Sequence, residues 1–144
     1  MKKIILFLIF NVFISCKSSI QETKTTKIVT IIGSEFYEIK FNNLGKAVAI
    51  KGEIYFFNDL SFHKEVRDSI NFNIIKTSKY FKLLKEYEKK PYYSEQLNNE
   101  FNVKIYCEDI KVFDSYRFDS FFWKLIKSIG DQIPKEYNSF IHSD

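Results

Sequence analysis

Asp59, Ser61 and His63 are a short cluster whose residue types could supply an orienting carboxylate, a nucleophile and a general base. In hydrolases these three groups usually come from separate segments, because each must point at the same reacting atom. Residues this close in sequence more commonly form a polar turn. The chain has no G-x-S-x-G elbow, and its four glycines form no phosphate-binding loop. We therefore expect a protein that is not an enzyme, and keep a small hydrolase as the alternative.

Metal binding needs several His, Cys or carboxylate side chains that converge on one point. The two histidines, His63 and His142, lie far apart in the sequence and belong to no H-x-H or H-E-x-x-H pattern. Four acidic residues bracket the last predicted hairpin: Glu108, Asp109, Asp114 and Asp119. Their positions fit a turn, a solvent-facing strand position and a helix cap. We expect no metal site and no cofactor.

The two cysteines, Cys16 and Cys107, occupy different contexts. Cys107 alternates in phase with Val103 and Ile105, so we expect it to be a buried small side chain in a strand. The neighbouring Glu108 and Asp109 should raise the pKa of its thiol, which makes a reactive role unfavourable.

Cys16 follows an N-terminal segment with the layout of an export signal. Lys2 and Lys3 give a positive start, residues 4–14 are apolar except for Asn11, and Ser15 is small. As a helix, these 11 residues would be roughly 16 Å long, against a hydrocarbon core of about 30 Å. The segment is therefore too short to cross a bilayer and is typical of a signal peptide, residues 1–15.

Phe13-Ile14-Ser15-Cys16 resembles the lipobox of bacterial lipoproteins, with Phe13 where Leu is usual. The resemblance implies cleavage between Ser15 and Cys16 and acylation of Cys16. It also implies a cell-envelope location, with the outer membrane favoured where one exists, because Lys17 follows the cysteine and Asp does not. The alternative is an ordinary secreted protein in which Cys16 is unmodified.

The chain after residue 15 has 129 of the 144 residues, which suits one domain with its own hydrophobic core. Lys2 and Lys3 are lost with the signal, so its net charge falls from +4 to +2. A nearly balanced charge argues against a nucleic-acid-binding module. We expect a lipidated cysteine and flexible tether over residues 16–27 and a single small domain over residues 28–144.

Alternating apolar residues predict an α+β domain with an antiparallel sheet of about five to six strands. The best-supported element is a hairpin of residues 36–41 and 46–57, in which Gly52 indicates a bulge or a close backbone approach. A strand over 69–74 and a second hairpin of 101–107 and 110–116 follow. Two helices are expected, one after a cap at Thr77 or Ser78 and one after a cap at Asp119, with Gly130 at the C-cap of the second. Their expected buried stripes are Tyr80, Phe81, Leu84 and Tyr87 in the first helix, and Phe122, Leu125, Ile126 and Ile129 in the second. Residues 92–100 are expected to be a loop and residues 135–144 a tail. The order is β-β-β-α-β-β-α, with a further weak strand over residues 28–32.

Aromatic residues are abundant, with 16 Phe and nine Tyr, and most fall on core-facing stripes. The exceptions are Tyr92 and Tyr93 in a polar stretch, and Tyr55 and Phe57, which give their strand two apolar faces. We expect these four to contact a partner, such as an envelope protein or cell-wall glycan. The domain also loosely resembles other small bacterial lipoproteins through a Tyr37-x-Ile39 hairpin and an Ile133-Pro134 ending, which imply no activity.

Overall fold

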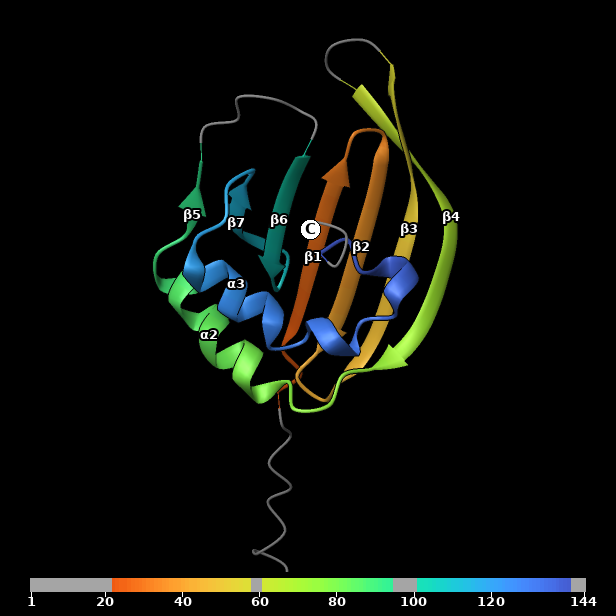
Figure 1. The fold of residues 1–144 in the computed structure, drawn as a ribbon. Helices are drawn as coiled ribbons and strands as arrows, with labels where there is room; N and C mark the ends of the chain where they lie inside the picture. Colours follow the sequence, from red (N-terminus) through yellow and green to blue (C-terminus); the bar gives the residue numbers. More distant parts are fainter. Residues whose placement is uncertain (1–21, 58–60, 95–100, 141–144) are drawn as a thin grey trace, which may run out of the picture.

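The computed structural model describes residues 22–57, 61–94 and 101–140, which form a seven-stranded sheet with all its helices on one face (Figure 1). The elements in chain order are β1 (Thr25–Ile32), β2 (Glu35–Asn42), β3 (Lys46–Phe57), β4 (Ser61–Asn73), α2 (Ser78–Lys89), β5 (Tyr92–Tyr93), β6 (Phe101–Cys107), β7 (Ile110–Ser115), α3 (Ser120–Lys127) and the short 3-10 helices η1 (Gly130–Gln132) and η2 (Lys135–Tyr137). Within this part of the chain, no helix has the length and apolar character needed to cross a bilayer.

The strand order across the sheet is β4-β3-β2-β1-β6-β7-β5. The predicted α+β class is confirmed, but the sheet has more strands than expected and is mixed, because β5 runs parallel to β7. The two-residue β5 lies in a stretch that we predicted to be a loop. A strand of two residues leaves no alternation in the sequence by which to recognise it.

The weakly predicted first strand is the centre of the sheet. β1 pairs with β2 on one side and with β6 on the other, and it begins at Thr25, three residues before the expected domain boundary. Thr26 is 2% exposed and lies opposite Phe41 and Cys107. The sequence did not predict this part of the strand, because residues 23–27 (TKTTK) are all polar although Thr26 is buried.

The first predicted hairpin is confirmed as β2 and β3. Gly45 closes its turn with a positive φ of 89°. Gly52 lies at a β-bulge, where the pairing of β3 with β4 shifts between Lys51 and Gly52. A side chain at Gly52 would collide with the Glu65 carbonyl and the Phe36 ring. The bulge and close approach expected at this glycine are both present.

β4 begins eight residues before the strand predicted over residues 69–74. Its early part escaped prediction because β4 is the sheet edge and Glu65, Val66, Arg67 and Asp68 are all exposed. An edge strand with a bulge has no continuously buried face, so its sequence does not alternate cleanly.

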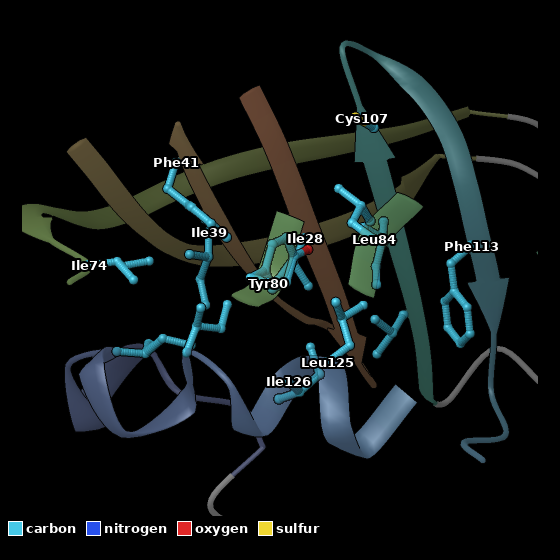
Figure 2. Packing of buried hydrophobic residues seen from close by; sticks show 14 of the residues in the cluster. Ile28, Ile39, Phe41, Ile74, Tyr80, Leu84, Cys107, Phe113, Leu125 and Ile126 are labelled. Atoms are coloured by element: carbon cyan, nitrogen blue, oxygen red, sulfur yellow. The ribbon is translucent and has the colours of Figure 1, made fainter. Parts of the chain in front are cut away.

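The core lies between the sheet and the two main helices (Figure 2). The predicted stripe on α2 is buried, and so is the predicted stripe on α3 and the residues just after it. These residues are Tyr80, Phe81, Leu84 and Tyr87, followed by Phe122, Leu125, Ile126 and Ile129. They pack on sheet residues such as Ile28, Ile39 and Phe41, with edge-on ring contacts of 4.8 Å between Phe41 and Tyr80.

The helix ends differ in part from expectation. Asp119 caps α3 as predicted, because its carboxylate accepts a hydrogen bond from Phe122 N at 2.7 Å. Thr77 precedes α2 but makes no capping bond; its hydroxyl donates to the Asn43 carbonyl at 2.7 Å. Gly130 does not end α3, which stops at Lys127, and it begins η1 instead. In the predicted C-terminal tail, Tyr137 is buried.

Candidate functional site

Tyr92 and Tyr93 are exposed as predicted, at 41% and 55%, but each also supports the sheet edge. The Tyr92 ring stacks on Phe113 with 5.4 Å between centroids. The Tyr93 hydroxyl donates to the Lys111 carbonyl at 2.6 Å, and the Lys111 ammonium lies 5.5 Å from the centroid of its ring. Both tyrosines therefore help to hold the sheet edge together, and only their outer faces are open to a partner.

Tyr55, the third predicted contact, is 41% exposed and donates a hydrogen bond to the Glu53 carboxylate. This bond raises the pKa of the Tyr55 hydroxyl. The side chain of Phe57, the fourth predicted contact, lies outside the described residues. Tyr55 lies on β3, next to one edge strand of the sheet, whereas Tyr92 and Tyr93 lie on β5 at the opposite edge. The predicted contacts therefore do not form one patch.

Beside Tyr55, three glutamates lie directly opposite one another on adjacent strands: Glu35 pairs with Glu53, and Glu53 pairs with Glu65. We call these the glutamate row. By strand alternation they share the helix-covered side of the sheet with Ile39. Arg67 forms an ion pair with Glu53. Like charges directly opposite each other destabilise a sheet, so this row is a feature that packing alone does not explain.

Cys107 is 4% exposed, as predicted, and its thiol donates to the Glu88 carboxylate at 2.8 Å. Glu88 also forms an ion pair with Lys24, just before β1. Burial, followed by the Glu88 carboxylate and then Glu108, raises the pKa of the Cys107 thiol to about 12. The predicted rise of the Cys107 pKa is confirmed in direction, but its main causes are burial and Glu88 of α2, which the sequence did not place near the thiol.

Of the cluster Asp59, Ser61 and His63 considered in the sequence, only the His63 side chain is described, and it is exposed on β4 opposite Tyr55. Asp59 and the Ser61 side chain lie outside the described residues, as do His142 and the lipidation and cleavage residues Cys16 and Ser15. In the described ranges, no group of three or more His, Cys, Asp or Glu side chains is placed to hold a metal ion.

The face of the sheet opposite the helices carries a concentration of lysines that the sequence did not reveal. We call it the open face, because every described helix lies on the other side (Figure 1). In one cross-strand row, Lys40 of β2 lies opposite Lys27 of β1, Lys27 opposite Tyr106 of β6, and Tyr106 opposite Lys111 of β7. We call these four residues the lysine row.

Aromatic rings support several of these ammonium groups. Lys27 Nζ lies 4.6 Å from the centroid of the Tyr106 ring, and Lys64 of β4 lies 4.9 Å from the centroid of Phe36. Burial lowers the pKa of Lys64; Glu38 opposes this shift, and the lysines Lys27 and Lys104 add to it. The positive charges of the open face are thus close enough to influence one another.

Asp114 is the main counter-charge at the β7 end of the open face. Lys111 Nζ lies 2.6 Å from Asp114 Oδ2, and Asn102 Nδ2 donates to Asp114 Oδ1 at 2.9 Å. Burial would raise the pKa of Asp114, but these two hydrogen bonds, with Lys104 nearby, hold it below its ordinary value. At the β2 end, neither Lys27 nor Lys40 has a carboxylate partner within the described ranges.

Two hollows on the described surface are each lined by two or more lysines. One, of 230 Å³, lies at the β2 end of the open face and is lined by residues that include Lys40, Lys46 and Asn71. The other, of 610 Å³, lies between the start of α2 and the end of α3 and is lined by Lys76, Lys79 and Lys127 among others. Both are open to solvent.

The lysine row could not have been found from net charge, because a sum over the chain says nothing of where charges gather. The usable signal was strand alternation: Lys40 lies between the core residues Ile39 and Phe41, and Lys104 between Val103 and Ile105. Those positions had to face away from the core. Their alignment into one row depends on the pairing of β2, β1, β6 and β7, which alternation does not give.

Comparisons of the chain with models of protein families, with curated proteins and with solved structures found no match.

Proposed function

We propose that this protein is a lipid-anchored component of a bacterial cell envelope whose folded domain binds and does not catalyse. The observation that carries the proposal is the order of residues at the start of the chain: two lysines, an apolar run of signal-peptide length, Ser15 and then Cys16. A diacylglycerol on Cys16, with a further acyl chain on its amino group, would hold the chain at a bilayer, since two or more chains are needed for stable anchoring.

The position of the domain relative to Cys16 supports this proposal. β1 begins at Thr25, nine residues after Cys16. The intervening residues leave room for an acylated cysteine in the bilayer and a separate folded domain in water. The free thiol that remains, Cys107, is buried and carries a raised pKa, so it is unsuited to acylation or catalysis.

The surface chemistry supports binding over catalysis. Its distinctive features are the outer faces of Tyr92 and Tyr93, Tyr55 beside the glutamate row, and the lysine row. They are spread over both sides of the sheet and do not converge on one reacting atom. Phe57 remains a proposed contact on sequence grounds. Partners of this class include another envelope protein or cell-wall glycan.

Metabolic labelling with a palmitate analogue in a bacterial host tests the anchor. We expect the wild-type chain to be labelled and to sediment with membranes, because Cys16 carries the acyl chains. Cys16→Ala should lose the label and accumulate as the unprocessed form. Cys107→Ala is the matched control and should be labelled like wild type. Equal labelling of the Cys16→Ala and wild-type chains would contradict the proposal.

A further inference from the structure

We propose that the open face of the sheet docks onto the anionic phospholipid headgroups of the membrane that holds the chain, through the lysine row. This inference rests on the proposed anchor for its biological setting, and it adds an orientation. The sheet would lie against the bilayer surface, and the helices and the glutamate row would face away from it.

The central pair of the lysine row is electrostatically unfavourable in the protein alone. Lys27 and Lys40 lie directly opposite each other on β1 and β2, where the Cβ atoms of such a pair are about 5 Å apart. Neither has a carboxylate partner among the described residues. Two adjacent ammonium groups that repel each other form a ready site for phosphate groups, whose charge would remove the repulsion.

The residues around this pair have the chemistry of a membrane surface contact. By strand register, the open face carries lysines from β1, β2, β3, β4, β6 and β7: Lys27, Lys40, Lys46, Lys64, Lys104 and Lys111. Its described carboxylates, Glu38 and Asp114, each lie near one of these lysines. Tyr106 and Tyr93 are interleaved with the lysines, and tyrosine favours the headgroup region because one end is apolar and the other polar.

The open face itself carries a net positive charge. Its six lysines outnumber its two described carboxylates, Glu38 and Asp114, so an anionic surface would attract this face. Lysines also lie on α2 and α3, so the comparison of lysine pairs from the two sides of the sheet decides the orientation.

The covalent distance to the anchor also favours a membrane over a soluble acidic partner. Eight residues lie between Cys16 and Thr25, and even a fully extended chain spans only about 30 Å from one to the other. Lys27 is two residues further along β1. A tethered domain therefore meets lipid headgroups at high effective concentration, and weak electrostatic contacts suffice to hold it.

Vesicle sedimentation of the full chain carrying Cys16→Ser tests the inference without any acyl chain. Vesicles of phosphatidylcholine alone are compared with vesicles containing one-quarter phosphatidylglycerol. Residues 1–15 contribute equally in all variants, so differences between variants report the domain. We expect the preference for anionic vesicles to fall about 25-fold in Lys27→Gln/Lys40→Gln, because each lysine near an anionic surface contributes roughly fivefold.

Two matched variants control for charge and for chemistry. Lys82→Gln/Lys85→Gln removes the same charge from the exposed side of α2 and should keep most of the preference for anionic vesicles. Lys27→Arg/Lys40→Arg should keep it fully. Because the Lys27–Lys40 repulsion is removed, the Gln pair should have a melting temperature no lower than wild type. A salt titration of the wild-type chain, in which 0.5 M NaCl abolishes the preference, gives an independent measurement.

The outcomes separate the alternatives. Equal losses in the two Gln pairs, or no preference of the wild-type chain for anionic vesicles, would overturn the inference. Binding of a soluble polyglutamate peptide that depends on Lys27 and Lys40, with no vesicle preference, would overturn it in favour of an acidic protein partner. If palmitate labelling fails but the preference for anionic vesicles is intact, the proposed anchor is wrong and the inference about the open face stands.

Discussion

At the scale of single residues, the Cys107 thiol shows how a burial site controls chemistry. Cys107 lies in β6, and its thiol donates a hydrogen bond to the Glu88 carboxylate of α2. The thiol can donate this bond only while it is protonated and neutral. A thiolate there would be desolvated and would lie beside a negative charge. The positive charge of Lys24 favours the thiolate and so opposes this effect, but it does not reverse it.

We predict that Cys107 does not react with a disulfide reagent at pH 8 while the protein is folded. With its pKa raised from an ordinary value of about 9 to about 12, the thiolate fraction is roughly a thousandfold lower. Spectrophotometric thiol counting should give no reactive thiol in the acylated native protein and one in denaturant. A native count of one would contradict either the burial of Cys107 or the modification of Cys16.

The same shift fixes the sign of a pH effect. A raised folded-state pKa means that Cys107 contributes stability below its unfolded pKa of about 9. That contribution is lost as the pH rises toward about 12, because the unfolded chain releases the proton first. In this window Cys107→Ala should lose less stability with rising pH than wild type does.

At the scale of elements, the bulge between β3 and β4 depends on the absence of a side chain at Gly52. The Phe36 ring of β2 lies over this glycine, 2.7 Å from where a Cβ atom would be, and the Glu65 carbonyl is closer still. The contact lets Phe36 be buried on the open face, where no described helix covers it.

We predict that Gly52→Ala destabilises the domain by about 2 kcal/mol or more, because the added methyl group must displace a ring and a backbone carbonyl. Chemical denaturation monitored by circular dichroism measures this change. Gly130→Ala is the matched control, since nothing lies within 4 Å of its Cβ position, and it should change the free energy of unfolding by less than about 0.5 kcal/mol. Similar values for the two variants would contradict the close approach at Gly52.

At the scale of the whole molecule, β1 joins the two halves of the sheet. The β2-β3-β4 strands lie on one side of it and the β6-β7-β5 strands on the other. Its buried side chains, including Thr26, Ile28 and Thr30, contribute to the helix-covered side, and its first residues are the ones closest to the proposed anchor.

We predict that a chain beginning at Glu22 folds cooperatively and that one beginning at Ile28 does not. The shorter chain loses Thr25 to Lys27, which pair with β2. Of these, Thr26 and Lys27 also pair with β6, and the Thr26 hydroxyl donates to the Tyr106 carbonyl at 2.9 Å. Thermal unfolding followed by circular dichroism distinguishes the two. Equal melting temperatures would place the true domain boundary at residue 28.

The sequence by itself determined the local elements with a strong period or a specific cap. It predicted the β2–β3 hairpin, both main helices with their buried stripes, the β6–β7 hairpin and the burial of Cys107, since each is marked by a local apolar period, a turn or a cap. It also provides the whole basis for the proposed signal and anchor at Ser15 and Cys16, which lie outside the described residues.

Beyond the two hairpins, only the tertiary structure decided which strands are neighbours. Pairing placed the weakly patterned β1 at the centre, extended β4 along the exposed edge, and added β5 in parallel. The same pairing aligned Lys40, Lys27, Tyr106 and Lys111 from four strands into one row, and gathered Glu35, Glu53 and Glu65 on the other side. Alternation tells each residue which face it takes, whereas cross-strand register, set by contacts distant in sequence, determines which charges meet there.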